Sequence, residues 1–134
     1  QAGTLSGNPL AMAGGLAQLS VLKATMPYVQ IERRGRRLLD AMSAQAASLG
    51  IPFWGDVIGA MWGFHFRSGP VRSFEDARSA DADYFARFFH ACLGRGVFLP
   101  ASPFEAAFLS VAHDDAAIDE TIEHMQLAMK EALA

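Results

Sequence analysis

The sequence predicts a two-layer α/β sandwich of the α+β class, in which helices cover one face of a small, mainly antiparallel sheet. The apolar residues of 28–49, 80–94 and 115–132 recur at helical spacing, and short strand patterns separate these segments. The 134 residues are 51% hydrophobic and 19% charged, which is enough chain to bury the core of one domain. This composition argues against a disordered chain.

The first segment, GTLSGNPLAM at 3–12, predicts a loop that runs into a helix. Asn8 is the expected N-cap, and Pro9 occupies the first helical position, where a missing N–H costs nothing. A helix N-terminus with the hydroxyls of Thr4 and Ser6 beside it suits a phosphate group. A capped helix without a ligand explains the same residues.

The helix that follows Pro9 has an apolar stripe and is interrupted at Met26-Pro27. Gly14 and Gly15 each cost roughly 1 kcal/mol against alanine inside a helix, so they indicate close approach by another backbone. The stripe consists of Leu10, Ala13, Leu16, Leu19 and Leu22. This helix is the one element without an obvious partner, and we expect it to bridge to another domain.

The second helix begins near Tyr28 and ends at Gly50, with Pro52 beyond. It contains the run ERRGRR at 32–37. Such a run can attract phosphate or nucleic acid, but the net charge of −3 favours a solvated helix face.

The segment 55–67 predicts one strand, because Trp62, Phe64 and Phe66 alternate with residues of the opposite face. A third helix lies between Ser73 and Arg95 and ends at Gly96. Its inward side chains are Phe85, Phe88, Phe89, Cys92 and Leu93.

Two further apolar runs, 97–99 and 107–112, predict short strands on either side of a turn at 100–103. Asp114 then caps the last helix. The core side of that helix is expected to consist of Ile118, Ile122, Met125, Met129 and Leu133. We expect the segments 60–66, 97–99 and 107–112 to form one sheet, with the helices at 80–94 and 115–132 packed on it.

Composition excludes several classes of function. The pI near 5.7 argues against a nucleic-acid partner, and no apolar run has the length of a membrane span. The single cysteine, Cys92, excludes an internal disulfide framework and fits a reducing compartment. We therefore expect a soluble, cytoplasmic chain. The four histidines have no partners at metal-ligand spacing, so no metal site is predicted.

Two stretches carry a family resemblance. GTLSGNPLAM and the segment from Val71 to Asp119, above all FLPASPFEAAFLSVAH at 98–113, resemble the glutamate-1-semialdehyde 2,1-aminomutases. These are pyridoxal-phosphate enzymes of the aspartate-aminotransferase fold, and the resemblance extends weakly through the rest of the chain. Ala107 stands where the family pattern has Gly, and Trp62 where it has Phe.

The resemblance implies that the chain is a C-terminal portion of such an enzyme. Residues 1–27 would be the phosphate loop and a bridging helix from the large-domain side, and residues 28–134 the small C-terminal α/β domain. The threonine of this loop, here Thr4, is expected to bind the phosphate of pyridoxal 5'-phosphate across the interface of a homodimer. The Schiff-base lysine of the family lies upstream of the loop, and Lys23 and Lys130 have the contexts of solvated residues. We therefore expect this chain alone to be inactive, with no catalytic residue of its own.

Glu105 is the second site residue that the resemblance implies. A carboxylate in a proline-flanked turn is usually only solvated, but the family places the glutamate of its FEA motif on the substrate side of the active site. The implied activity is conversion of glutamate-1-semialdehyde to 5-aminolevulinate, in tetrapyrrole biosynthesis, by the full polypeptide with the cofactor alternating between pyridoxamine and pyridoxal forms. The alternatives are a fragment of another class III aminotransferase and a stand-alone, non-catalytic α/β module that serves in assembly.

Overall fold

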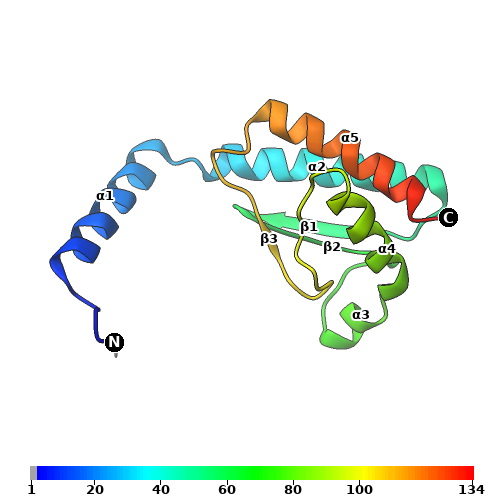
Figure 1. Ribbon diagram of the computed structural model, residues 1–134, viewed down its shortest axis with the longest axis horizontal. Coiled ribbons are helices and arrows are strands. Elements are labelled where there is room, and N and C mark those ends of the chain that lie inside the picture. The colour runs from blue at the N-terminus through cyan, green and yellow to red at the C-terminus, as the bar shows by residue number, and fades with distance from the viewer. Residues whose placement is uncertain (1–2) are drawn as a thin grey trace.

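The computed structural model describes residues 3–134 and places five helices and three strands in them. The order is α1 (Pro9–Thr25), α2 (Tyr28–Leu49), β1 (Trp54–Ile58), β2 (Met61–His65), α3 (Phe74–Arg78), α4 (Ala82–Leu93), β3 (Ala107–Phe108) and α5 (Asp115–Glu131). Figure 1 shows α1 extending away from a compact body that contains every other element. The predicted fold class is confirmed.

The sheet is antiparallel throughout, in the order β1-β2-β3. Residues 55–67 form a hairpin rather than the single predicted strand, since Ile58 pairs with Met61 across the turn at Gly59 and Ala60. Gly59 has a φ of 60°, a conformation that glycine adopts without steric cost. Neither turn residue, Gly59 or Ala60, is polar. The apolar pattern of 55–67 is therefore not interrupted by a polar residue that would mark the turn.

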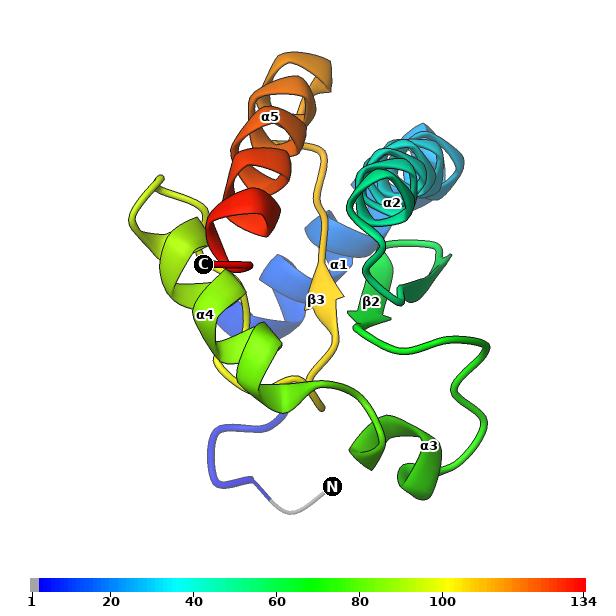
Figure 2. The same cartoon turned by 90° about the vertical axis from the view of Figure 1, so that its right-hand side faces the viewer.

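Helices α2, α4 and α5 form the layer on one face of this sheet (Figure 2). Phe64 of β2 packs against Phe88 of α4, with ring centroids 5.8 Å apart, and Phe66 packs against Tyr84 at 4.5 Å. The predicted inward face of Trp62, Phe64 and Phe66 is confirmed, because all three are buried. Within this layer, helix α5 packs mainly on α2 and α4.

The helix ends follow the predicted capping residues. The side chains of Asn8 and Asp114 accept hydrogen bonds from the amides of Ala11 and Ala117, and Gly50 ends α2 with a φ of 69°. The segment predicted as one helix at 80–94 begins at Ala82, and the separate short helix α3 precedes it. Leu93 and Leu133, predicted to face inward, are exposed because each lies at or beyond the end of its helix.

The predicted strand at 97–99 is wrong. The amide of Val97 donates to the carbonyl of Cys92 and so belongs to the end of α4, while Phe98 is 80% exposed. The predicted strand at 107–112 shrinks to Ala107–Phe108, and a turn from Ser110 to His113 follows. In the part of the chain that the structure describes, no helix is long and apolar enough to cross a membrane.

Candidate functional site

The turn that carries Glu105 lies between the end of α4 and β3. The amides of Phe104 and Glu105 donate to the hydroxyl and the carbonyl of Ser102, both at 3.2 Å. Strand β3 fixes the end of this loop, because Ala107 pairs with Trp62 and the amide of Leu109 donates to the carbonyl of Ala60 at 2.9 Å. The Glu105 side chain is exposed.

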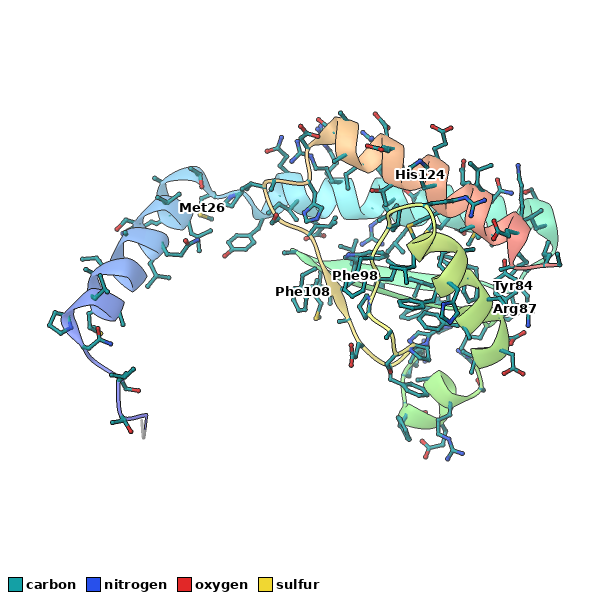
Figure 3. All side chains as sticks on the ribbon, viewed as in Figure 1. Met26, Tyr84, Arg87, Phe98, Phe108 and His124 are labelled. Carbon is teal, nitrogen blue, oxygen red and sulfur yellow. The ribbon has the colours of Figure 1, made fainter. Side chains whose placement is uncertain are left out.

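A groove of 590 Å³ runs beside this turn, and we call it the Glu105 groove. Its walls come from the loop 96–109, from Trp62 of β2, from Leu38 of α2 and from α5. Phe98 and Phe108, on the two arms of the loop, both line it (Figure 3). An apolar wall with a few polar groups is typical of small-molecule sites.

Two polar side chains besides Glu105 line the groove, and a third polar group is buried within Trp62 of its wall. His113 accepts a hydrogen bond at Nδ1 from the amide of Ser110 at 3.0 Å, which leaves Nε2 as the protonated nitrogen of the neutral ring. The Thr121 hydroxyl donates to the carbonyl of Ala117 at 2.7 Å. The indole N–H of Trp62 is buried and has no hydrogen-bond partner within the described residues.

The loop with Thr4 lies at the far end of α1, and Figure 1 shows this end of the chain well away from the turn at 102–105. Thr4 is exposed. The start of α1 offers few free donors: Pro9 has no N–H, and the amides of Ala11 and Met12 donate to the side chain and the carbonyl of Asn8. The loop therefore offers its hydroxyls, more than the helix N-terminus, as hydrogen-bond donors.

Neither lysine belongs to the groove. Lys23 and Lys130 are both exposed and lie on α1 and α5. Burial raises the pKa of the Cys92 thiol to about 12, so this cysteine stays a protonated, inert group at neutral pH. Within residues 3–134, no group of three or more potential metal ligands gathers.

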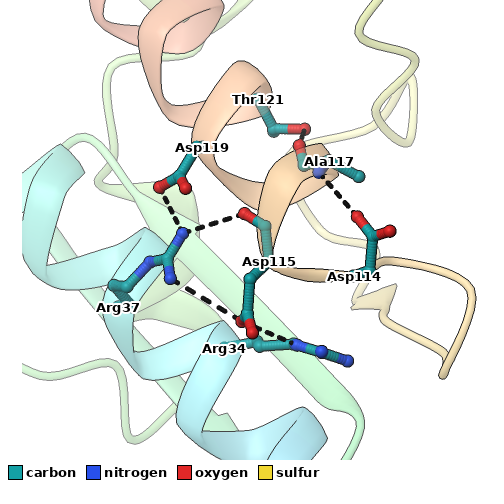
Figure 4. Close-up of polar contacts among 7 residues, drawn as sticks. All are labelled: Arg34, Arg37, Asp114, Asp115, Ala117, Asp119 and Thr121. Carbon is teal, nitrogen blue, oxygen red and sulfur yellow. Dashed lines mark hydrogen bonds and ion pairs between the residues drawn. The ribbon is translucent and has the colours of Figure 1, made fainter.

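A second cavity, of 940 Å³, is lined by the arginine run of α2. Sequence reasoning predicted a solvated face here, and this is wrong for Arg34, which is 8% exposed. Its Nε donates a hydrogen bond to the carboxylate of Asp115 of α5 at 3.0 Å. The guanidinium of Arg37 donates hydrogen bonds to the carboxylate of Asp119 and the backbone carbonyl of Asp115 (Figure 4). The hydrogen bond from Arg34 holds the pKa of Asp115 below its usual range. These pairs fasten α2 to α5, and they neutralise much of the cavity's positive charge.

The fold is that of a part of the transaminases. The chain superimposes over 100% of its length on an omega-transaminase from Sphaerobacter thermophilus, with a TM-score of 0.80, 20% identity and 30% of that chain covered. A second solved structure, described as a transaminase with PLP bound, gives a TM-score of 0.77 at 18% identity over 99% of this chain and 30% of its own length. No family model matches the chain.

The sequence comparison is more specific. The chain is 48% identical over 131 residues to the glutamate-1-semialdehyde 2,1-aminomutase of Opitutus terrae, and 47% identical over 133 residues to that of Persephonella marina. These matches cover 98% and 99% of this chain and 31% of each relative. The chain is thus a homologue of a C-terminal portion of the glutamate-1-semialdehyde 2,1-aminomutases and spans less than a third of their length.

Proposed function

We propose that the chain is the C-terminal part of a pyridoxal-phosphate-dependent aminomutase that converts glutamate-1-semialdehyde to 5-aminolevulinate. The observation that carries this proposal is the 48% identity to an aminomutase over 98% of the chain. The transaminase fold supports the cofactor class, since the solved neighbours include a transaminase with PLP bound. When bound, the cofactor supplies the electron sink for moving the amino group.

In this proposal, Thr4 donates a hydrogen bond to the cofactor phosphate of the partner subunit in a cytoplasmic homodimer. Its exposure and its distance from the body of this chain are consistent with a role toward another subunit. Because the amides of Ala11 and Met12 already donate to Asn8, the Thr4 hydroxyl is one of the few donors that the loop offers to a phosphate. A hydrogen bond to a charged group contributes about 1.5–3 kcal/mol.

The test of Thr4 uses the full-length protein. Thr4→Val should weaken cofactor binding by roughly ten- to a hundredfold, and Thr4→Ser should largely preserve it. Ser20→Ala is the matched control, because it removes an exposed hydroxyl from α1 outside the loop. An unchanged cofactor dissociation constant in Thr4→Val would reduce this loop to a helix cap.

Glu105 is proposed to lie on the substrate side. Its carboxylate stands at the edge of a groove whose wall also includes His113, and it disfavours a substrate carboxylate at that position. This chain's residues therefore orient the amino-bearing end of the substrate, whereas the lysine that binds the cofactor is expected upstream. The chain alone is proposed to be inactive, and titration with pyridoxal phosphate should give no saturable, stoichiometric absorbance band.

The decisive experiment is an assay of the full-length polypeptide with glutamate-1-semialdehyde and no external amino donor. Formation of 5-aminolevulinate, reduced in Glu105→Gln, supports the proposal. Turnover only with an added amino donor would instead identify another class III aminotransferase. A full-length protein that binds no cofactor, and that does not turn over glutamate-1-semialdehyde with or without an amino donor, would favour the non-catalytic assembly module.

A further inference from the structure

Helix α3 has no buried residue of its own, yet it is firmly attached to the end of the sheet. Arg67, just beyond β2, donates to the Ser79 hydroxyl at 3.1 Å and to the carbonyls of Gly69 and Pro70 at 2.8 and 2.7 Å. Its guanidinium also lies 3.7 Å from the carboxylate of Asp76. Asp76 in turn closes a capping box with Ser73, so the first turn of α3 is fixed from both sides.

The first residue of α3 is Phe74, which is 62% exposed. It packs on the ring of Phe104, 53% exposed, with centroids 5.6 Å apart and planes inclined by 49°. The centroid separation lies within the contact range of about 4.5–7 Å for aromatic pairs, and the inclination falls between the stacked and edge-to-face arrangements. The contact joins two segments that are 30 residues apart in sequence, and Phe104 is the immediate neighbour of Glu105.

The turn itself is lightly held from within. Its hydrogen bonds run from the amides of Phe104 and Glu105 to Ser102, both at 3.2 Å. A contact with an element fixed to the sheet therefore restricts where the Glu105 backbone can move.

We infer that Phe74 is a positioning residue for Glu105, acting through its ring contact with Phe104. The inference rests on the proposed function, in which Glu105 lies on the substrate side. Arg67 and Asp76 hold α3 against the end of the sheet, and Phe74 of α3 contacts Phe104. This contact connects α3 to the turn that carries the Glu105 carboxylate.

The first test measures hydrogen exchange of the peptide containing 102–106 in the full-length protein. Phe74→Ala should speed exchange of these amides by about two- to tenfold, the range that one aromatic pair supports. Phe74→Tyr keeps the ring and should leave exchange unchanged. Leu127→Ala, which trims an exposed apolar side chain on α5, is the control for general loosening. Unchanged exchange in Phe74→Ala overturns the inference.

The second test asks whether Phe74 acts through Glu105. Phe74→Ala should lower kcat/KM by about two- to tenfold, with rescue by Phe74→Tyr, and should have no further effect in a Glu105→Gln background. Independent, additive losses overturn the positioning role. If Glu105→Gln leaves kcat/KM unchanged, both the proposed role of Glu105 and the positioning role of Phe74 are overturned. If Phe74→Ala leaves hydrogen exchange of 102–106 unchanged, only the inference about Phe74 is overturned.

Discussion

Helices α1 and α2 are neighbours in sequence, but only α2 is amphipathic and buries one face, whereas the apolar residues of α1 lie around most of its circumference and are exposed. Helix α2 buries seven residues, including Leu38 and Met42, whereas α1 buries none. Leu10, Leu16 and Leu19 of α1 are 83%, 69% and 66% exposed. A helix that is apolar all round is expected to be covered, but its sequence does not say whether the covering surface belongs to the same chain.

The relatives supply a reason for the difference. They are about three times as long as this chain, so a partner for α1 in the remainder of the polypeptide is consistent with the proposed function. The division of the chain at residue 27 stays a proposal on the same grounds. Three matched experiments test the contrast between the two helices.

The largest difference is expected for one leucine from each helix. Leu38→Ala removes a side chain that is 0% exposed and should lower the free energy of unfolding by about 2–5 kcal/mol. Leu16→Ala should change it by less than about 0.5 kcal/mol. Urea unfolding of both variants of this chain measures the contrast, and similar losses would mean that α1 packs on the body in solution.

A smaller effect, of opposite sign in the two helices, is expected for Gly→Ala substitutions. A Cβ on Gly35 would lie 2.8 Å from Cγ2 of Val57, a stiff and buried side chain. Overpacking costs about 1–3 kcal/mol and helix propensity returns about 1, so Gly35→Ala should lose up to about 2 kcal/mol.

Gly14 is the matched position in α1, because nothing lies within 4 Å of a Cβ placed there. Gly14→Ala should stabilise α1 by up to about 1 kcal/mol, measured as slower amide exchange within that helix. The sequence prediction that another backbone approaches Gly14 stays open. A loss of stability from the same substitution in the full-length protein would support it.

The third experiment uses acid. The pKa of Asp115 lies below its ordinary value of 3.8, because Arg34 donates a hydrogen bond to the charged form. Its contribution to stability is therefore complete above the ordinary pKa and is lost as the pH falls through the lower, folded value. Asp115→Asn should flatten the fall in stability below about pH 4, measured by urea unfolding at several pH values. The helicity of α1 should not follow this titration, since its first turn has no acidic residue.

Local signals predicted much of the fold. Asn8, Gly50 and Asp114 ended or began their helices as expected, because capping depends on a few neighbouring residues. The hairpin at Gly59 and the unpaired segment 97–99 were missed, since an apolar run alone does not distinguish one strand from two, or a strand from a loop. The burial of Arg34 could have been predicted, because Arg34 lies four residues before Leu38 and so on the same, buried face of α2.

The candidate site was harder to predict than the fold. The turn with Glu105 was visible from its flanking prolines, but the groove beside it was not. Trp62 and His113 line this groove together only because β3 pairs with β2 in the register that sets Ala107 against Trp62. The sequence predicted that these two segments share a sheet, but it does not reveal the register of their pairing.

The junction between α1 and α2 makes the first helix a lever arm. Met26 has a φ of 42°, and its amide donates to the carbonyl of Leu22, so the chain turns there within two residues. At 1.5 Å per residue, the 17 residues of α1 span about 25 Å. A change of about 10° in one backbone angle at Met26 therefore displaces the far end of α1, and the Thr4 loop with it, by as much as about 4 Å. That displacement exceeds the length of a hydrogen bond, so the placement of Thr4 depends on Met26 and Pro27 as much as on the loop itself.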